Sequence, residues 1–552
     1  MRRRTAAAKR IGEVGGAAGL ALLAATTAAS AQVEQLRHEG TENDARLGES
    51  VARIGDLDLD GCDDWLVSEP NHGRNANFGR VFVLSGATAT VIRTHIGPSA
   101  SDFLGTKVAG LGDVDGDAIP DYAYSMVGHV TSSGSFVGRV EACSGATGQI
   151  LWGTDGADGY DWFGRQLMPY EDLDGDGACD LVVSHLDVVD SLEVLSGATG
   201  ARLAALDTPF DFADSMALLH DIDGDGRRDF AVGCTWDWVN FSLEGTVSLY
   251  SGATGNKIAT ILGGAADYHF GHAITAVSDL DQDGVDDFLV TAGVSYGKWD
   301  GVIEVRSGAT LGLLRKIQGT TNEERGAALG TCADWDGDGV DDYVATSSGV
   351  PPYGVVRVYS SSTDAVLHEF VGERSASSHD ILFGRTLATG DWNGDGIGDL
   401  LIPAEEWYGS VGTNRGIVHC ILGCPASQSS YGVGFPGTLG TPTLSISGDP
   451  ELGATLTFAA DNSLGAATIG WVLIGDAAAA IPLKKGGTLL ALPQIVLTVP
   501  IDANGFSQDE QLPDDPALGF SDFFLQIVQI DPGAAGGLSM TQGLQLRLGW
   551  DY

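Results

Sequence analysis

The chain has 552 residues and carries 74 acidic against 30 basic side chains, a formal net charge of −44 at pH 7. Binding to nucleic acid or to anionic lipid requires a basic surface, so this charge excludes both classes of partner.

The N-terminal segment has the pattern of a secretory signal peptide. A basic run that ends at Arg10 precedes an apolar stretch over 19–29, and Ala29-Ser-Ala31 is a small-residue cleavage site. We therefore expect residues 1–31 to be removed before Gln32. The mature protein is then expected to be secreted or displayed at the cell surface, with no segment long enough to span a membrane.

An aspartate-rich loop of nine residues recurs seven times, about 57 residues apart. Oxygen ligands stand at loop positions 1, 3, 5 and 9 around a turn that usually has Gly at position 6, and this arrangement suits Ca²⁺. Up to seven Ca²⁺ ions are expected per chain. The expected ligands are Asp56, Asp58, Asp60 and Asp64; Asp113, Asp115, Asp117 and Asp121; Asp172, Asp174, Asp176 and Asp180; Asp221, Asp223, Asp225 and Asp229; Asp279, Asp281, Asp283 and Asp287; Asp334, Asp336, Asp338 and Asp342; and Asp391, Asn393, Asp395 and Asp399.

The residues after each loop distinguish it from an EF-hand. An EF-hand has a bidentate Glu at position 12 and flanking helices, whereas no copy here has a carboxylate at that position, as Val67 and Val183 illustrate. Short apolar runs such as Trp65-Leu-Val67 follow the loops and indicate buried strands. Each loop is therefore predicted to be the tip of a β-hairpin.

Two further elements repeat with the loop. Phe-Gly or a variant of it stands about nine residues before most loops, as at Phe163-Gly164. After each loop comes a strand such as Gly79–Thr88, which ends in Ser-Gly-Ala-Thr, and then a last strand such as Val91–Ile96. Four strands per repeat make the blade of a propeller. The predicted fold is all-β, with a seven-bladed β-propeller over residues 32–426 and a calcium-binding hairpin in each blade.

Closure of the ring can also be read from the sequence. The seventh repeat lacks its last strand, because Gly423-Cys-Pro-Ala-Ser interrupts the chain there. The segment Val33–Glu39 has the missing pattern. We expect this N-terminal strand to complete the seventh blade and to cover its open edge.

Phe-Gly, then Asp-x-Asp-x-Asp-Gly-x-x-Asp, then a Gly-rich strand resembles the FG-GAP repeat of the N-terminal propeller of integrin α subunits. The resemblance covers residues 32 to about 426. It implies calcium binding, an extracellular location and adhesion or ligand recognition, and does not imply catalysis. This chain departs from the integrin pattern by having a loop in every blade. The second loop has Ala118 in place of Gly and Pro120 at position 8, and the seventh has Asn393 at position 3, so these two sites are in question.

The chain changes character after Cys424. Residues 427–441 are rich in Ser, Gly and Pro, which predicts a linker. Residues 442–552 have no calcium loop, and short alternating segments such as Ile469–Ile474 and Phe523–Val528 predict a small accessory β-sandwich.

Strings typical of enzymes occur out of context. Gly293–Gly297 matches a nucleophile elbow but no helix follows it, and the pair His269 and His272 lacks the Glu and the helix of a metalloprotease. The seven cysteines include no CxxC pair and indicate no zinc site, although Cys420 and Cys424 are close enough in sequence to form a disulfide. We expect no catalytic residue and no cofactor other than Ca²⁺.

Aromatic residues are frequent in the loops opposite the calcium hairpins. Such side chains can stack on sugars or anchor a protein partner, or they can fold back over the blade ends. The candidates for a ligand face are Trp236, Trp238, Trp299, Trp407 and Tyr408. The chain is therefore interpreted as a calcium-binding propeller for an extracellular protein or glycan. The alternatives are a structural envelope component without a defined ligand, and a polysaccharide-active enzyme on a propeller scaffold.

Overall fold

A computed structural model describes residues 36–547 with short gaps, and these residues form two compact units, Leu36–Gly423 and Cys424 onward. The residues in the gaps are 43, 74–75, 158–161, 186–191, 207–212, 237, 240–241, 265–268, 294–299, 321–322, 336–337, 349, 351–353, 373–382, 391, 393–397, 406–414, 422–426, 449, 451–453, 476–477, 485 and 513–521.

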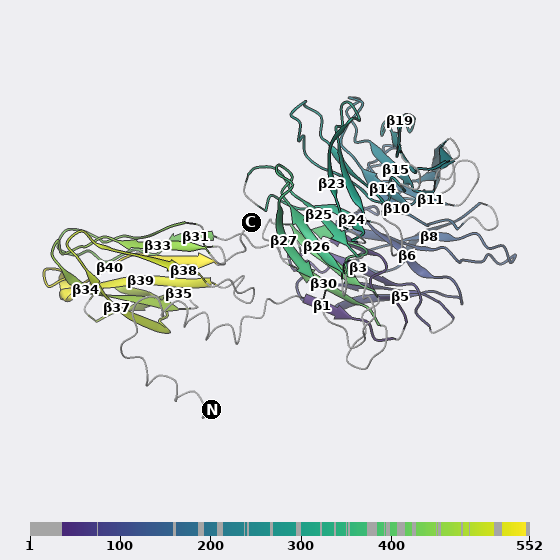
Figure 1. Cartoon of the computed structure of the whole chain (residues 1–552). Coiled ribbons are helices and arrows are strands. Elements are labelled where there is room, and N and C mark those ends of the chain that lie inside the picture. Colours follow the sequence, from purple (N-terminus) through teal and green to yellow (C-terminus); the bar gives the residue numbers. More distant parts are fainter. Residues whose placement is uncertain are drawn as a thin grey trace. The chain divides into compact units, whose positions relative to one another are not determined.

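The first unit is a seven-bladed β-propeller (Figure 1). Its described residues form seven four-stranded antiparallel sheets. Six of them follow one another along the chain and are, in spatial order, β2 (Val51–Gly55), β3 (Asp64–Glu69), β4 (Arg80–Leu84) and β5 (Val91–Ile96); β6 (Leu104–Gly112), β7 (Asp121–Met126), β8 (Arg139–Cys143) and β9 (Ile150–Asp155); β10 (Leu167–Pro169), β11 (Leu181–Ser184), β12 (Leu192–Leu195) and β13 (Arg202–Leu206); β14 (Ser215–Leu218), β15 (Phe230–Cys234), β18 (Thr246–Tyr250) and β19 (Lys257–Leu262); β20 (Ile274–Ala276), β21 (Phe288–Ala292), β22 (Val302–Arg306) and β23 (Leu313–Gln318); and β24 (Arg325–Thr331), β25 (Tyr343–Ser347), β26 (Val355–Tyr359) and β27 (Val366–Val371). A small hairpin of β16 (Trp238–Val239) and β17 (Ser242–Leu243) is inserted in the fourth blade.

The burial of each strand follows its place in the blade. The second and third strands are almost wholly buried, whereas the fourth alternates between exposed and half-buried positions, as β5 does. Apolar side chains pack between neighbouring blades: Leu66 and Val81 of the first blade lie in one cluster with Tyr122 and Tyr124 of the second. Burial of this kind stabilises by about 25 cal/mol for each Å² of apolar surface removed from water. The blades therefore stabilise one another around the ring.

The two repeated glycine elements join one blade to the next. Gly79, which precedes the third strand of the first blade, forms a parallel bridge with Leu104 of the second. A Cβ atom at Gly79 would lie 2.1 Å from the backbone nitrogen of Leu104. The same bridge joins Gly138 to Phe163. The motif therefore serves close backbone approach between blades, where only Gly fits.

The predicted closure of the ring is confirmed. The seventh sheet has the order β1 (Leu36–Glu39), β30 (Ile417–Ile421), β29 (Asp399–Ala404) and β28 (Ala388–Gly390), and β1 pairs with β30 in antiparallel register (Figure 1). Leu47 of the first blade forms the same parallel bridge with Gly416 of the seventh. Trp65 and Trp392, both fully buried, face each other across this junction with ring centroids 6.4 Å apart.

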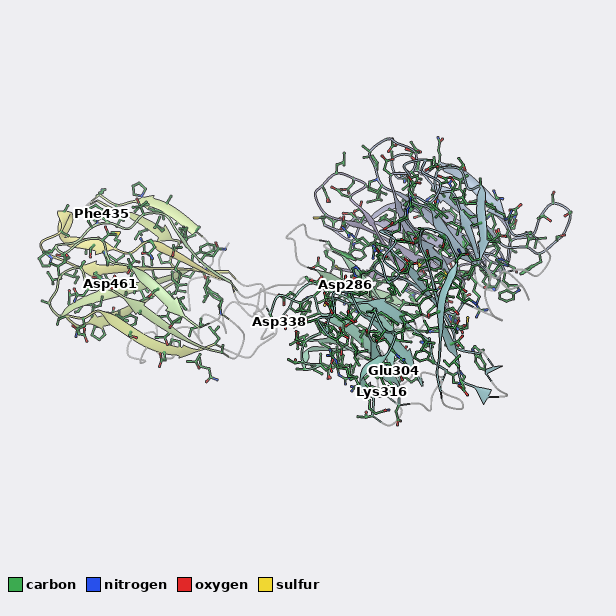
Figure 2. All side chains as sticks on the ribbon, turned by 90° about the horizontal axis from the view of Figure 1, so that it is seen from above. Asp286, Glu304, Lys316, Asp338, Phe435 and Asp461 are labelled. Atoms are coloured by element: carbon green, nitrogen blue, oxygen red, sulfur yellow. The ribbon has the colours of Figure 1, made fainter. Side chains whose placement is uncertain are left out.

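Ion pairs hold several of the charged side chains that the blades bury. The carboxylate of Glu304 in β22 is 1% exposed and lies 2.7 Å from the ammonium of Lys316 in β23, and Figure 2 shows the two side chains next to each other. Burial raises the pKa of Glu304, but hydrogen bonds from Lys316 and Arg306 outweigh this effect, and the pKa lies below its usual value.

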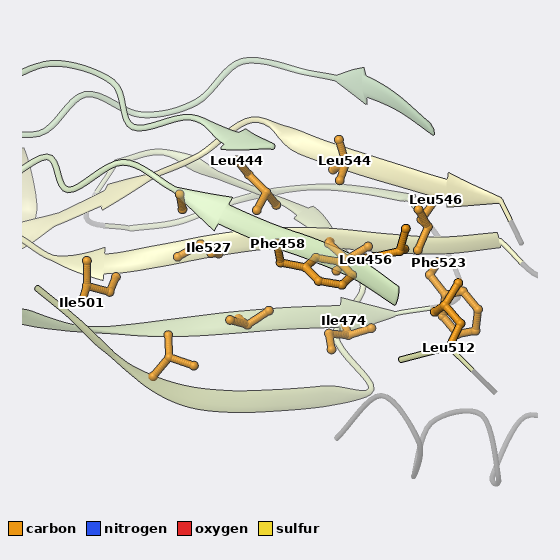
Figure 3. Packing of buried hydrophobic residues seen from close by; sticks show 14 residues of the cluster. Leu444, Leu456, Phe458, Ile474, Ile501, Leu512, Phe523, Ile527, Leu544 and Leu546 are labelled. Carbon is orange, nitrogen blue, oxygen red and sulfur yellow. The ribbon is translucent and has the colours of Figure 1, made fainter. Parts of the chain in front are cut away.

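The second unit is the predicted β-sandwich. One sheet has the order β31 (Ser427–Tyr431), β41 (Gly543–Arg547), β39 (Asp522–Ile530), β34 (Thr468–Gly475) and β37 (Ile495–Ile501), with β40 (Leu538–Met540) paired to β39. The other consists of β32 (Leu444–Ser447), β33 (Thr455–Ala460) and β38 (Phe506–Gln511). A hairpin of β35 (Ala478–Pro482) and β36 (Thr488–Ala491) and a short 3₁₀ turn, η2 (Ala535–Gly537), complete the unit. Leu456 and Phe458 pack against Ile474, Ile527 and Leu546 between the two sheets (Figure 3).

The linker expected over 427–441 is interrupted by structure. Residues 427–431 form strand β31, which pairs with β41 from Ser427 opposite Arg547 to Tyr431 opposite Gly543. A Ser-rich segment can pair in a sheet because the ladder uses backbone groups only. The sandwich therefore includes the start of the segment whose composition predicts a linker.

Among the described residues, no helix has both the length and the apolar character needed to cross a membrane. Cys420 is buried. Cys424 lies outside the described residues, so the disulfide between the two stays a prediction.

Candidate functional site

The aspartate loops lie where the sequence predicts them, between the first and second strand of each blade. In five loops, three carboxylates each offer an oxygen within 4.8 Å of the others. These clusters are Asp56, Asp58 and Asp64; Asp113, Asp115 and Asp121; Asp172, Asp174 and Asp180; Asp221, Asp223 and Asp225; and Asp279, Asp281 and Asp287. Carboxylate oxygens at such spacing are hard ligands that suit a divalent cation such as Ca²⁺ or Mg²⁺.

Backbone N–H groups fix the carboxylate at position 1. In the second loop, Asp113 accepts hydrogen bonds from the N–H groups of Gly116, Asp117 and Ala118 at 2.7, 3.1 and 2.8 Å. The carboxylate of Asp115 accepts one from Asp117 at 3.2 Å. The loop is therefore organised by its own aspartates, which satisfy backbone donors that the tight turn leaves without a partner.

The aspartate at position 9 joins the loop to the third strand. Asp64 is fully buried, and its carboxylate accepts hydrogen bonds from the N–H of Leu57 at 2.8 Å and from that of Gly86 at 2.9 Å. Gly86 belongs to the Ser-Gly-Ala-Thr turn, so this motif is a second support for the loop. The equivalent carboxylates accept from Gly145, Gly197, Gly252, Gly308 and Ser361.

The serine of the same turn contacts the loop as well. The hydroxyl of Ser251 donates to the carboxylate of Asp225 at 2.9 Å, and that of Ser307 donates to Asp283 at 3.2 Å. Ser-Gly-Ala-Thr therefore orients acidic side chains at positions 5 and 9. The sequence shows that the aspartate loop and the Ser-Gly-Ala-Thr turn recur together, but only the structure shows that they contact each other.

The carboxylates at position 9 carry a burial penalty. Burial, with a smaller contribution from the charges of Asp58 and Asp60, raises the pKa of Asp64 to about 6 despite backbone hydrogen bonds that lower it. Burial is also the first cause of the raised pKa values of Asp121, Asp180, Asp229 and Asp287. A bound cation would offset both the burial and the mutual repulsion of these groups. The residues therefore fit a divalent metal.

The second loop keeps this geometry despite its departure from the repeat. Ala118 stands at position 6 with φ of 70°, close to the 94° of Gly177 in the third loop. The left-handed conformation is strained for a residue with a Cβ atom. Asp113, Asp115 and Asp121 are nevertheless brought together. The substitution therefore strains the backbone without separating the carboxylates.

We expect Ala118→Gly to stabilise the protein by about 1 kcal/mol, because it removes the strain of a left-handed alanine. Calcium affinity should rise with it. The matched reverse change is Gly177→Ala, where an added Cβ would meet no atom within 4 Å, so that only the backbone is tested. Denaturant unfolding at fixed calcium measures both. Equal stability of the wild type and Ala118→Gly would show that the loop relaxes without strain.

The remaining predicted ligands divide into two groups. In the first five loops, one predicted ligand per loop lies outside the three-carboxylate cluster, namely Asp60, Asp117, Asp176, Asp229 and Asp283. In the sixth and seventh loops, the structure describes Asp334, Asp338, Asp342 and Asp399. In those two loops the position 9 contact recurs, from Trp335 to Asp342 at 2.7 Å and from Trp392 to Asp399 at 2.6 Å. Asp336, Asp391, Asn393 and Asp395 lie outside the described residues.

A cavity of about 740 Å³ lies on the propeller axis. All seven blades line it with residues at the start of the first strand, just after each Phe-Gly pair or its variant, as Glu49, Arg165 and His272 do. The calcium loops begin where the same first strands end. The cavity and the loops therefore occupy opposite ends of the blades.

The structure describes only some of the aromatic residues predicted to form a ligand face. Trp236 lines the cavity, is 55% exposed and packs edge-on against His269 with ring centroids 5.1 Å apart. The backbone of Trp238 lies in β16, and its side chain is outside the description. Trp299, Trp407 and Tyr408 lie outside the described residues.

Sequence reasoning missed the charged lining of the cavity. Lys107, Arg385 and Glu405 line it, together with the exposed Trp162. The position after each Phe-Gly pair is the signal that could have found part of this set, since it holds Glu49, Arg165, His272 and Arg385 in four of the blades.

Comparison with known proteins supports the repeat assignment. No family model matches the chain. Integrin alpha pat-2 of Caenorhabditis briggsae is 37% identical over 98 residues, which are 16% of this chain and 8% of the relative. Integrin alpha-2 of Mus musculus is 32% identical over 101 residues, 17% of this chain and 8% of the relative. Integrin alpha-E of Mus musculus is 28% identical over 230 residues, 38% of this chain and 20% of the relative. The chain thus spans a fifth or less of these relatives and resembles the integrin α chains in its FG-GAP repeats.

Proposed function

We propose that this chain is a secreted calcium-binding β-propeller that recognises an extracellular protein or glycan. Calcium has a structural role in the blade hairpins, and recognition takes place at the opposite end of the blades. The signal peptide expected over 1–31 supports the extracellular location. The adhesion receptors with similar repeats support the recognition role.

The separation of the two ends of the blades carries this proposal. One end holds five described carboxylate clusters. The other has a cavity of about 740 Å³ with half-exposed tryptophans, Trp162 and Trp236, in its lining. A concave site with a few polar groups and exposed aromatic rings is typical of ligand recognition.

Calcium in the hairpins would fix more than the loops themselves. The aspartate at position 9 is hydrogen-bonded to the Ser-Gly turn before the fourth strand. An ion in the loop would therefore hold together two connections of the blade, the loop between the first and second strands and the turn between the third and fourth. This rigid scaffold would hold the loops at the far end in place. Calcium removal is therefore expected to weaken recognition indirectly, through the blade.

The recognition face is tested by Trp236→Ala against a panel of glycans and extracellular matrix proteins. Loss of a central aromatic anchor is expected to weaken binding by about tenfold or more. The matched control is Leu59→Ala, which removes a 71% exposed apolar side chain from a calcium loop at the other end. If a ligand is found and Trp236→Ala binds it at wild-type strength while folded, the recognition face lies elsewhere.

A further inference from the structure

The axial cavity combines charged groups from several blades. The charges of Glu49 and Glu405 raise the pKa of Lys107, and those of Arg385 and Arg165 lower it. These residues come from the first, second, third and seventh blades, so their side chains face one shared space. Burial is the main cause of the lowered pKa of Lys107.

Most of these charges are paired. Arg165 lies 3.8 Å from Asp214, and Arg385 lies 3.4 Å from Glu405. Lys107 differs, because no carboxylate of the described residues lies within 4.0 Å of its ammonium. Its backbone N–H donates to the hydroxyl of Ser125 at 3.0 Å, which fixes the strand and leaves the side chain to the cavity. An unpaired, half-buried ammonium is a ready partner for an anion.

Two further polar atoms of the lining lack hydrogen-bond partners among the described residues. The Oε1 atom of Glu405 is buried without one, in a side chain that is 1% exposed. Burial raises the pKa of this carboxyl to about 7, so near neutral pH it is partly protonated and can donate a hydrogen bond. The Nδ1 atom of His272 is likewise buried without a partner. Polar atoms left unsatisfied in a cavity call for a ligand or water that satisfies them.

We propose that the axial cavity binds a sugar that carries a carboxylate, a hexuronate unit of an acidic glycan. The carboxylate would pair with Lys107, the hydroxyls would hydrogen-bond Glu405 and His272, and the ring would stack on Trp236. This inference rests on the proposed recognition function and names its ligand class. A neutral sugar would leave Lys107 unpaired, and a simple anion would leave the other polar atoms unsatisfied.

The net charge of −44 opposes an acidic ligand at long range. At physiological ionic strength, however, charges further than about 8 Å away are largely screened. The groups that line the cavity therefore decide the binding. The described lining also carries the carboxylates of Glu49, Asp214 and Glu324. Of its Lys and Arg side chains, Lys107 alone has no ion pair within 4.0 Å, so it is the group that an added carboxylate would pair with.

The test is calorimetric titration of the calcium-loaded full chain with sodium glucuronate, with glucose as the neutral probe. Glucuronate should saturate one site per chain and bind at least about tenfold more tightly than glucose. Lys107→Met should lose about tenfold or more in affinity, and Lys107→Arg should retain binding because it keeps the charge. The control is Lys257→Met, which removes an exposed lysine from β19 and should bind as the wild type does.

Thermal unfolding checks that Lys107→Met remains folded. No saturation by glucuronate at concentrations of about 10 mM, or equal affinity of Lys107→Met and the wild type, would overturn the inference. Its failure can be distinguished from failure of the proposed function. If a protein or a neutral glycan binds in a way that requires Trp236 but is unaffected by Lys107→Met, the recognition face stands. Only the proposal of an acidic sugar is then rejected.

Discussion

A chain that starts at Thr41 is expected to lose the closed ring. It lacks β1, which pairs with β30 over four residues from Leu36 to Glu39. Each backbone hydrogen bond contributes about 1 kcal/mol net, so the ladder contributes on the order of 3 kcal/mol. Leu36 also packs against the core between the seventh and first blades. The melting temperature should fall by about 5 °C.

The truncated chain should also associate with itself. Removal of β1 exposes the edge of β30, whose residues are all buried in the intact protein. An exposed, apolar strand edge is a template for pairing with another chain. Light scattering should therefore detect oligomers of the truncated protein. A truncated chain that stays monomeric with an unchanged melting temperature would contradict closure by the N-terminal strand.

Rescue in trans supplies the control for this experiment. A synthetic peptide of residues 32–40 should bind the truncated chain, restore its melting temperature and return it to a monomer. The intact chain has no free edge at β30 and should not bind the peptide. The contrast separates a missing strand from general damage to the fold.

Removal of calcium is expected to have the largest effect on stability. Binding only to the folded state stabilises by about 2.7 kcal/mol per site when the free ion is at a hundredfold excess over Kd. Several such sites in one propeller would together dominate its stability. Chelation should therefore lower the melting temperature strongly, and calcium should restore it. Magnesium should restore it poorly, because it gives up its water ligands reluctantly.

A single substitution tests whether the carboxylates of one loop hold one calcium ion. Asp223→Ala removes an exposed carboxylate from the cluster of the fourth loop and should remove one bound ion per chain. The matched control is Asp509→Ala, which removes an exposed carboxylate of the sandwich that contacts Thr457 at 2.7 Å. It should leave the calcium content unchanged. Equal loss of calcium in both variants would show that general charge, rather than the loop, holds the ions.

The periodic features of the fold could be predicted from the sequence. The loops, the Phe-Gly pairs and the Ser-Gly-Ala-Thr turns recur at one spacing, so the blade follows from local pattern. Closure could be predicted because a missing strand in the seventh repeat matched a surplus one before the first loop. The observed strand, Leu36–Glu39, lies inside the expected segment.

Contacts between distant residues could not be predicted in this way. The cavity gathers Lys107, Arg385 and Glu405 from two blades that are neither adjacent in sequence nor similar at these positions. The bond from Gly86 to Asp64 joins two motifs whose separate roles the sequence does not relate. Strand β31 depends on its partner β41, which lies more than 100 residues later in the sequence, and a Ser-rich composition does not indicate this pairing.

The calcium content of the purified full chain tests the central claim most directly. Native mass spectrometry after exchange into calcium, with elemental analysis as the quantitative check, counts the ions that each chain retains. Five described carboxylate clusters and two further loops of the same pattern predict at least four tightly bound Ca²⁺ and up to seven. Fewer than four ions per chain would contradict the account of a propeller that calcium holds together blade by blade.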